Sequence, residues 1–188
     1  DVYGTEPWKL NLSSKEASLI KDINPGTGKS HPSNFHSVGD DVYFFAGDQY
    51  LFGHHKFLYK TDGTESGTTE VYNFEQGCGT RIFSVGSQVI LLIEDTYNEN
   101  NFSLWKTDGT AEGTSPLQSM GHFSGLGTSL DPAIQADDYV AFLQNNNGQF
   151  TLKAMNGSLE ETVLLENSGY LKAYWRKDGF LFFINSMR

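Results

Sequence analysis

The sequence predicts an all-β fold, a β-propeller with four blades of four antiparallel strands each. A turn motif built on Asp-Gly-Thr recurs at intervals of 46 to 51 residues, and a short apolar run recurs once between successive copies. An interval of this length accommodates four strands of about five residues together with their loops. Four-stranded antiparallel units that repeat at this spacing are typical of propeller blades.

The two clearest copies of the turn motif share the pattern Lys-Thr-Asp-Gly-Thr-x-x-Gly-Thr, within residues 57–68 and 103–114. In such a pattern the Asp accepts a hydrogen bond from the backbone two residues later, and the Gly adopts a positive φ. Strands are expected on both sides of the turn, over 57–61 and 69–74 in the first copy. The residues expected to form these structural turns are Asp62, Gly63, Asp108 and Gly109.

Two weaker copies of the motif complete a set of four repeats. Each copy has an anchor position just before its turn, and successive anchors lie 51, 46 and 48 residues apart. The anchors are Trp8, Tyr59, Trp105 and Lys153. The repeats then span approximately residues 1–55, 56–101, 102–149 and 150–188 of a single domain.

An apolar run of five residues follows a turn-forming segment in every repeat. The runs are 42–46, 89–93, 139–143 and 180–184. Their β-branched and aromatic side chains favour strands over helices. Because the runs are apolar throughout rather than alternating, we expect both faces of these strands to be buried between neighbouring sheets.

The phase of the repeats suggests how the array is completed. The sequence opens just before an anchor strand and closes just after an apolar run, so its N-terminal half-blade is expected to pair with its C-terminal strands and close a ring. Division of 188 residues by four gives 47 per blade, which agrees with the repeat length. The alternatives are half of an eight-bladed ring, completed by a homodimer, or a fragment of a larger propeller.

Composition and charge exclude several kinds of partner. The net charge is −10, which disfavours binding to nucleic acids and to anionic membrane surfaces. No apolar run approaches the length of a membrane span, so no membrane insertion is expected. Cys78 is the single cysteine and therefore forms no disulfide within the chain.

These repeats resemble the ELWxxDGT family, found mostly in large bacterial surface and secreted proteins. Residues 103–110 match the motif that names the family except at Ser103, and residues 3–8 are similar to the segment that precedes it. The resemblance implies a propeller-like array, secreted or on the cell surface, with no established catalytic residues. A looser, architectural similarity is to hemopexin-type four-bladed propellers, whose apolar strand pair residues 39–50 resemble.

Three of the anchors are aromatic and are candidate ligand-binding residues. Trp8, Tyr59 and Trp105 occupy equivalent positions, and aromatic rings that repeat in this way stack on sugars in lectin propellers. Packing between blades is the competing explanation for one aromatic side chain per blade. The sequence therefore leaves a lectin with one site per blade as an alternative function.

Patterns for catalysis, cofactors or metals are weak. Residues 26–30 resemble part of a phosphate-binding loop, but Ile23 stands where the first Gly of that loop is required. His54 and His55 are adjacent, and adjacent side chains on a strand point to opposite faces, so no metal site is expected. The chain is predicted to need no cofactor and not to be an enzyme. An enzyme with a site in the central channel remains a further alternative.

Three Asn-x-Ser/Thr sequons are glycosylation sites if the source is eukaryotic. Asn101 is the strongest candidate because it follows a polar stretch, and the others are Asn11 and Asn156. Taken together, the sequence predicts an extracellular, non-catalytic binding or adhesion module. Its polar loops, 50–55, 94–101 and 145–148, would present a contact surface to a protein or glycan partner.

Overall fold

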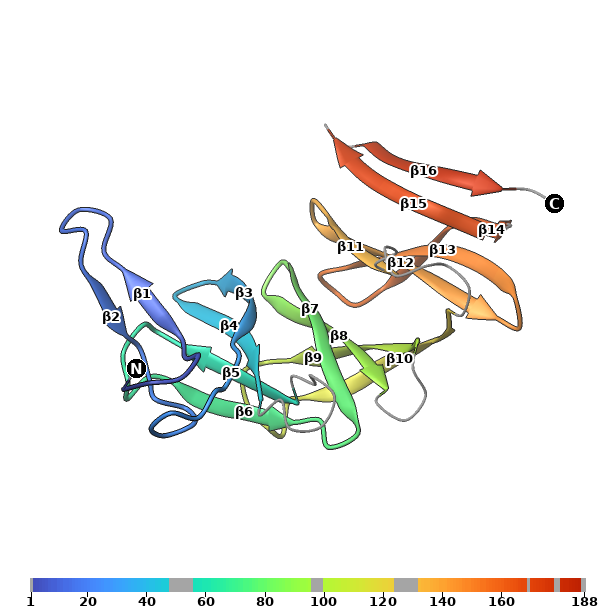
Figure 1. Ribbon diagram of the computed structural model, residues 1–188. Coiled ribbons are helices and arrows are strands. Elements are labelled where there is room, and N and C mark those ends of the chain that lie inside the picture. The colour runs from blue at the N-terminus through green and yellow to red at the C-terminus, as the bar shows by residue number, and fades with distance from the viewer. Residues whose placement is uncertain are drawn as a thin grey trace.

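The structure, a computed structural model, describes residues 2–47, 56–95, 100–123, 132–168, 170–177 and 180–186, with side chains as far as residue 166. The described residues form sixteen β-strands (Figure 1). Among them, no helix is long and apolar enough to cross a membrane.

The strands are β1 (Trp8–Leu10), β2 (Ala17–Leu19), β3 (Ser33–Val38), β4 (Asp41–Ala46), β5 (Phe57–Thr61), β6 (Thr69–Asn73), β7 (Gly77–Val85), β8 (Gln88–Asp95), β9 (Asn101–Thr107), β10 (Ser115–His122), β11 (Ala133–Ala136), β12 (Tyr139–Asn146), β13 (Gln149–Asn156), β14 (Glu161–Ser168), β15 (Tyr170–Lys177) and β16 (Phe180–Ser186).

Three complete units follow one another along the chain, each a four-stranded antiparallel sheet in which consecutive strands are neighbours. They comprise β3–β6, β7–β10 and β11–β14. The sheets lie side by side in sequence order (Figure 1). The prediction of an all-β chain built from repeated four-stranded sheets is therefore confirmed.

The two ends of the chain form half-units. Among the described strands β1 pairs only with β2 and β15 only with β16, so each end is a two-stranded sheet. The expected pairing of the first half-unit with the last is not formed in this structure. The two hairpins lie at opposite ends of the row of sheets, which keeps their edges apart (Figure 1).

The apolar runs form the second strand of every unit. Within the apolar runs of β4, β8 and β12 most side chains are buried, as the continuous apolar pattern predicts. They supply Phe45, Leu91 and Phe142 to two hydrophobic clusters that extend between adjacent sheets. These three second strands are buried on both faces because the sheet of each is packed between neighbours.

Both Asp-Gly-Thr segments form tight turns. The backbone N–H of Thr64 donates to Asp62 Oδ1 at 2.8 Å, and Gly63 has a φ of +89°. The second copy repeats this geometry, with Thr110 N–H at 2.9 Å from Asp108 Oδ1 and a φ of +88° at Gly109. The later Gly of the motif is explained as well, because a Cβ on Gly67 would lie 2.1 Å from Asp62 Oδ1.

A buried pair of threonines closes each of these hairpins. The Oγ1 atoms of Thr61 and Thr68 are 2.7 Å apart, and those of Thr107 and Thr114 are 2.8 Å apart. Thr61 Oγ1 also accepts the N–H of Gly63 at 2.9 Å. The first and last Thr of the motif are thus the buried polar partners that satisfy the turn backbone.

Polar contacts link each unit to the next. Lys9 Nζ in the first half-unit donates to the carbonyl of Gly63 at 2.7 Å. In the following junction Lys60 lies near the equivalent turn at Asp108. The pKa of Asp108 is lowered by the hydroxyl of Thr110, by backbone N–H groups and, to a smaller extent, by the charge of Lys60. His36 Nε2 and Ser84 Oγ, from β3 and β7, lie 2.9 Å apart across the same pair of sheets.

The segment that resembles part of a phosphate-binding loop has a structural partner. The buried carboxylate of Glu6 accepts hydrogen bonds from the Ser30 backbone N–H at 3.0 Å, the Ser30 hydroxyl at 2.5 Å and the Ile23 backbone N–H at 3.0 Å. These donors tie the N-terminal segment to the connection between β2 and β3. The donors of Ser30 are therefore occupied by a carboxylate of the chain itself.

Candidate functional site: an open cleft at Trp105

A cleft of about 620 Å³ opens where the first and second complete sheets meet. It lies between the end of β6 and the strands β8 and β9. Its volume falls within the range of small-molecule sites, which is about 300–1,000 Å³. The residues that give it its chemical character are Tyr72, Asn73, Phe74, Glu75, Asp95 and Trp105.

Three aromatic rings pack together at the cleft. The centroid of Trp105 is 5.8 Å from that of Tyr72 and 5.3 Å from that of Phe74, the second contact being edge-to-face at 87°. Tyr72 and Phe74 are themselves 5.0 Å apart. Phe74 is buried, whereas Tyr72 and Trp105 are only half-buried and keep surface toward the cleft.

The chain after β6 is shaped to hold these rings in place. Asn73 Oδ1 accepts the backbone N–H of Glu75 at 2.9 Å, and the N–H of Gly77 donates to the Phe74 carbonyl at 2.7 Å. Glu75 adopts a φ of +33°, which turns the chain sharply from one sheet to the next. Gly77 is required in this turn because a Cβ there would lie 2.6 Å from Ile93 Cγ2.

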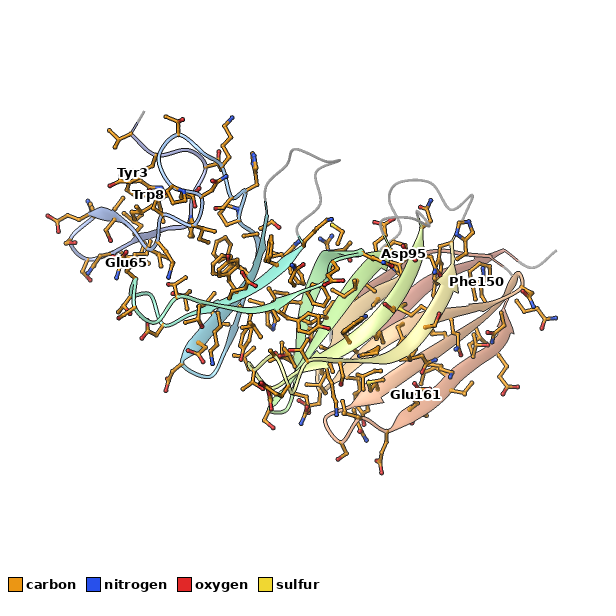
Figure 2. The ribbon with its side chains drawn as sticks, turned by 90° about the horizontal axis from the view of Figure 1, so that it is seen from below. Tyr3, Trp8, Glu65, Asp95, Phe150 and Glu161 are labelled. Atoms are coloured by element: carbon orange, nitrogen blue, oxygen red, sulfur yellow. The ribbon has the colours of Figure 1, made fainter. Side chains whose placement is uncertain are left out.

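Polar and acidic groups surround the aromatic rings. The indole N–H of Trp105 donates to Ser103 Oγ at 2.9 Å, which fixes the orientation of the ring. Glu75 is exposed and Asp95 is half-buried, and both line the cleft. Figure 2 shows Asp95 at one end of the strands of the second sheet. Aromatic surface bordered by hydrogen-bonding groups suits a ligand with one apolar face and polar edges.

The equivalent aromatic residues have different surroundings. Trp8 is 50% exposed on β1, and its ring meets that of Tyr3 edge-on with the centroids 6.3 Å apart (Figure 2). Tyr59 stacks on Phe44 at 5.5 Å and donates its hydroxyl to Glu70 at 3.4 Å. Burial, followed by the nearby charge of Glu70, raises the pKa of Tyr59 to about 12. Of the three candidate ligand-binding residues, Trp105 is the one that lines the cleft.

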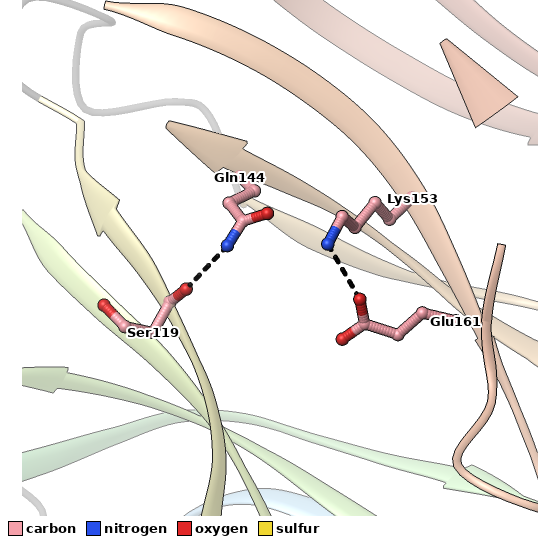
Figure 3. A network of polar contacts seen from close by, with 4 residues as sticks. All are labelled: Ser119, Gln144, Lys153 and Glu161. Atoms are coloured by element: carbon pink, nitrogen blue, oxygen red, sulfur yellow. Dashed lines mark hydrogen bonds and ion pairs between the residues drawn. The ribbon is translucent and has the colours of Figure 1, made fainter. Parts of the chain in front are cut away.

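The fourth anchor occupies the next junction and is polar. Lys153 Nζ forms an ion pair with Glu161 at 2.8 Å, and Gln144 Nε2 donates to the Ser119 carbonyl at 3.4 Å (Figure 3). Gln118 has the strand position that corresponds to Tyr72, because it pairs with Leu104 as Tyr72 pairs with Leu58. In the side-chain amide orientation that gives every neighbouring group a partner, the amide N–H of Gln118 donates to the Glu161 carboxylate. An ion pair and amides therefore replace the aromatic rings found at Trp105.

Other candidate positions from the sequence are also located. Asn101 lies within β9, opposite His122, and not in a loop as expected. Asn11 is exposed in the turn after β1, where its Oδ1 accepts the N–H of Ser13 at 2.9 Å. Asn156 donates its side-chain amide to Glu160 at 3.0 Å. The exposed Asn11 is thus a more accessible sequon than Asn101.

Among the residues described, no group of three or more His, Cys, Asp or Glu side chains is placed to hold a metal ion. His54 and His55 lie outside the described residues, as do the whole of the expected contact loop 50–55 and residues 96–99 of the second loop. Cys78, the single cysteine of the sequence, lies on β7. The carboxylates of Asp62 and Asp108 are engaged in their turns.

No family model and no curated protein matches this chain. Among solved structures, it is similar to an exo-β-1,3-galactanase from Phanerochaete chrysosporium with β-1,3-galactotriose, at 14% identity and a TM-score of 0.44, over 98% of this chain and 47% of that one. It is also similar to an exo-β-1,3-galactanase from Clostridium thermocellum, at 10% identity and a TM-score of 0.43, over 99% of this chain and 46% of that one. The chain spans about half the length of each.

These neighbours correct one expectation from the sequence. The chain was expected not to be an enzyme, but both of these solved structures are enzymes. The negative prediction is therefore withdrawn. The likeness concerns the all-β framework and assigns no reaction to this chain.

Proposed function

We propose that this chain is a carbohydrate-binding module whose binding site is the cleft at Trp105. The observation that supports the proposal is the half-buried Trp105 ring, held by Tyr72 and Phe74 in a cleft of about 620 Å³ with polar groups around it. A pyranose ring has an apolar face that stacks on an indole and hydroxyl groups that bind to polar edges. The site has both of these features.

The pattern of the anchors supports a single site of this kind. A lectin with one site per unit requires the same surroundings at every anchor. Here Trp105 lines a cleft, whereas Lys153 at the next junction is paired with Glu161. We therefore propose one glycan site for the chain in place of the one site per blade that the repeats suggested.

The charge around the cleft indicates the class of glycan. Glu75 and Asp95 line it, and the chain as a whole carries a net charge of −10. Sialylated, uronic-acid or sulfated sugars would be repelled by this field. The proposed ligands are therefore neutral oligosaccharides, whose hydroxyl groups donate hydrogen bonds to carboxylate oxygens.

A glycan array followed by titration calorimetry tests the proposal. Trp105→Ala should weaken binding of the strongest neutral oligosaccharide by about tenfold or more, which corresponds to about 1.4 kcal/mol. Trp8→Ala is the matched control, because it removes the same side chain at the equivalent position outside the cleft. Thermal unfolding of both variants checks that the fold is kept.

A second variant separates ligand contact from packing. Glu75→Gln preserves the size of the side chain and leaves the three rings untouched, and it should alter affinity without a change in unfolding temperature. If Trp105→Ala and Glu75→Gln both bind as the parent does, or if no neutral glycan binds saturably, the proposal is wrong.

The remaining expectations from the repeats stay predictions. They are the propeller arrangement of the units, the secreted or cell-surface location and a role in adhesion to a protein partner. The three sheets that succeed one another with the same strand order support a propeller-type arrangement. The ELWxxDGT resemblance is the sole basis for the location.

A further inference from the structure

The two half-units leave open two strand edges that are internal in the complete units. In each complete sheet the second strand is hydrogen-bonded to the third, as β8 is to β9. β16 contains an apolar run, so it corresponds to the second strand of a complete unit. β1 contains the anchor Trp8, so it corresponds to the third strand. Among the described strands, neither β16 nor β1 has its expected partner. An unpaired row of N–H and C=O groups is a template for another strand.

The two edges are complementary in register. In all three complete sheets the fourth residue of the second strand, counted from the first hairpin turn, pairs with the anchor on the third strand. The pairs are Phe44 with Tyr59, Leu91 with Trp105 and Phe142 with Lys153. In the last hairpin Lys177 pairs with Phe180, which is the same sequence spacing as that of the pair Val38 and Asp41. The same count places Phe183 opposite Trp8, and hence Phe182 opposite Lys9 and Leu181 opposite Leu10.

Exposed apolar side chains are found where the missing strands belong. Leu10 is 57% exposed, although its equivalents Thr61 and Thr107 are buried in the complete units. Trp8 is 50% exposed, whereas the equivalent Trp105 is half-buried and packs on Tyr72 of the preceding sheet. At the other end of the row, Val163 and Leu164 of β14 are exposed. Phe35 and Tyr139 within the complete units are exposed as well. The apolar surface at both ends of the array is nevertheless the surface that an added strand pair would cover.

We infer that the β16 edge of one molecule binds the β1 edge of a second copy, so that β15, β16 and the partner's β1 and β2 form one four-stranded unit. The second copy is favoured over closure within one chain because the two hairpins lie at opposite ends of the row (Figure 1). Two copies that pair at both ends contain eight units, and this closed arrangement leaves no second or third strand without a partner.

The composite unit also restores the packing seen between complete units. Tyr72 of one sheet packs on Trp105 of the next at 5.8 Å. Leu165 has the position of Tyr72 in the last complete sheet, because it pairs with Leu152 as Tyr72 pairs with Leu58. Pairing of β16 with the partner's β1 therefore places the partner's Trp8 beside β14, next to the exposed Val163 and Leu164.

The mass in solution is the first test. Light scattering should give about twice 20.9 kDa for the 188-residue chain. Leu10→Asp, within the proposed pairing, should return the mass to that of one chain. Leu12→Asp is the matched control, because Leu12 is 84% exposed in the turn beyond β1 and takes no part in the pairing. Circular dichroism checks that both variants keep their strands.

Engineered disulfides determine the register and the identity of the partner strand. In a Cys78→Ser background, Lys9→Cys with Phe182→Cys and Leu10→Cys with Leu181→Cys test two adjacent pairs, one of which is a close, non-hydrogen-bonded pair. A disulfide-linked dimer on a non-reducing gel is the expected product. Leu12→Cys with Leu181→Cys, which is out of register, should not cross-link.

Two results would overturn the inference. A monomer with a disulfide within one chain means that the array closes on itself, and a monomer with no disulfide in either pair means that the edges do not pair. Neither result bears on the glycan site, because the cleft at Trp105 lies within complete units of one chain.

Discussion

The ring of Phe45 in β4 fills the space beside Gly79 in β7, so that a Cβ built on Gly79 would lie 2.2 Å from a ring carbon. The two residues belong to adjacent sheets, and both are buried. Gly79 is thus the point at which the backbone of one unit rests on the aromatic core of the unit before it. Close packing of this kind transmits any change in side-chain volume directly to the junction.

Gly79→Ala should therefore destabilise the chain by about 1–3 kcal/mol, the usual cost of overpacking a core. Denaturant unfolding followed by circular dichroism measures the loss. Combining Gly79→Ala with Phe45→Leu, which removes the ring, should cost less than the sum of the single changes. Strict additivity of the two costs would show that the two residues do not meet.

Thr61→Val should destabilise the first hairpin. The change removes a buried hydroxyl that contacts Thr68 at 2.7 Å and accepts the N–H of Gly63 at 2.9 Å. Leaving buried polar groups without a partner costs about 1–3 kcal/mol. Thr69→Val on the exposed surface of β6 is the control. Equal unfolding midpoints for the two variants would contradict the role given to the threonine pair.

His36 should make the junction between the first two complete sheets sensitive to acid. Burial lowers the pKa of His36 from 6.5, so the unfolded chain binds a proton more readily than the folded chain. The stability that neutral His36 contributes is complete above about pH 6.5 and declines as the pH falls below it. The unfolding temperature should therefore drop between pH 7.5 and pH 5.5. This drop should be smaller in His36→Gln than in the unaltered protein. His122→Gln, which changes an exposed histidine, is the control and should show the same drop as the unaltered protein.

Tyr59 should titrate apart from exposed tyrosines. Its pKa is raised to about 12 by burial and by the charge of Glu70, whereas an ordinary tyrosine titrates near 10. The unfolded chain loses this proton first, so the contribution of Tyr59 to stability is complete below pH 10 and is lost as the pH rises toward 12. Absorbance at alkaline pH should show a late tyrosinate step that is missing in Tyr59→Phe and kept in Tyr3→Phe.

Local patterns in the sequence determined the strands and the turns. Runs such as 89–93 have side chains that suit a strand buried on both faces, and β8 has that burial. The Asp-Gly-Thr motif specifies its turn within a few residues, through Asp62 as acceptor and Gly63 at positive φ. The paired Thr61 and Thr68 were present in the same pattern and could have been recognised from their positions at either end of the motif.

Tertiary structure alone decided which equivalent residues share a function and which strands have partners. Trp8, Tyr59 and Trp105 have the same position in their repeats, but the sheet packed against each one leaves the first exposed, stacks the second on Phe44 and places the third in a cleft. Likewise, the sequence contains enough strands for four units, and the arrangement of the sheets leaves β1 and β16 apart. Turns and strands depend on neighbours in sequence, whereas exposure and pairing depend on which distant surface lies alongside.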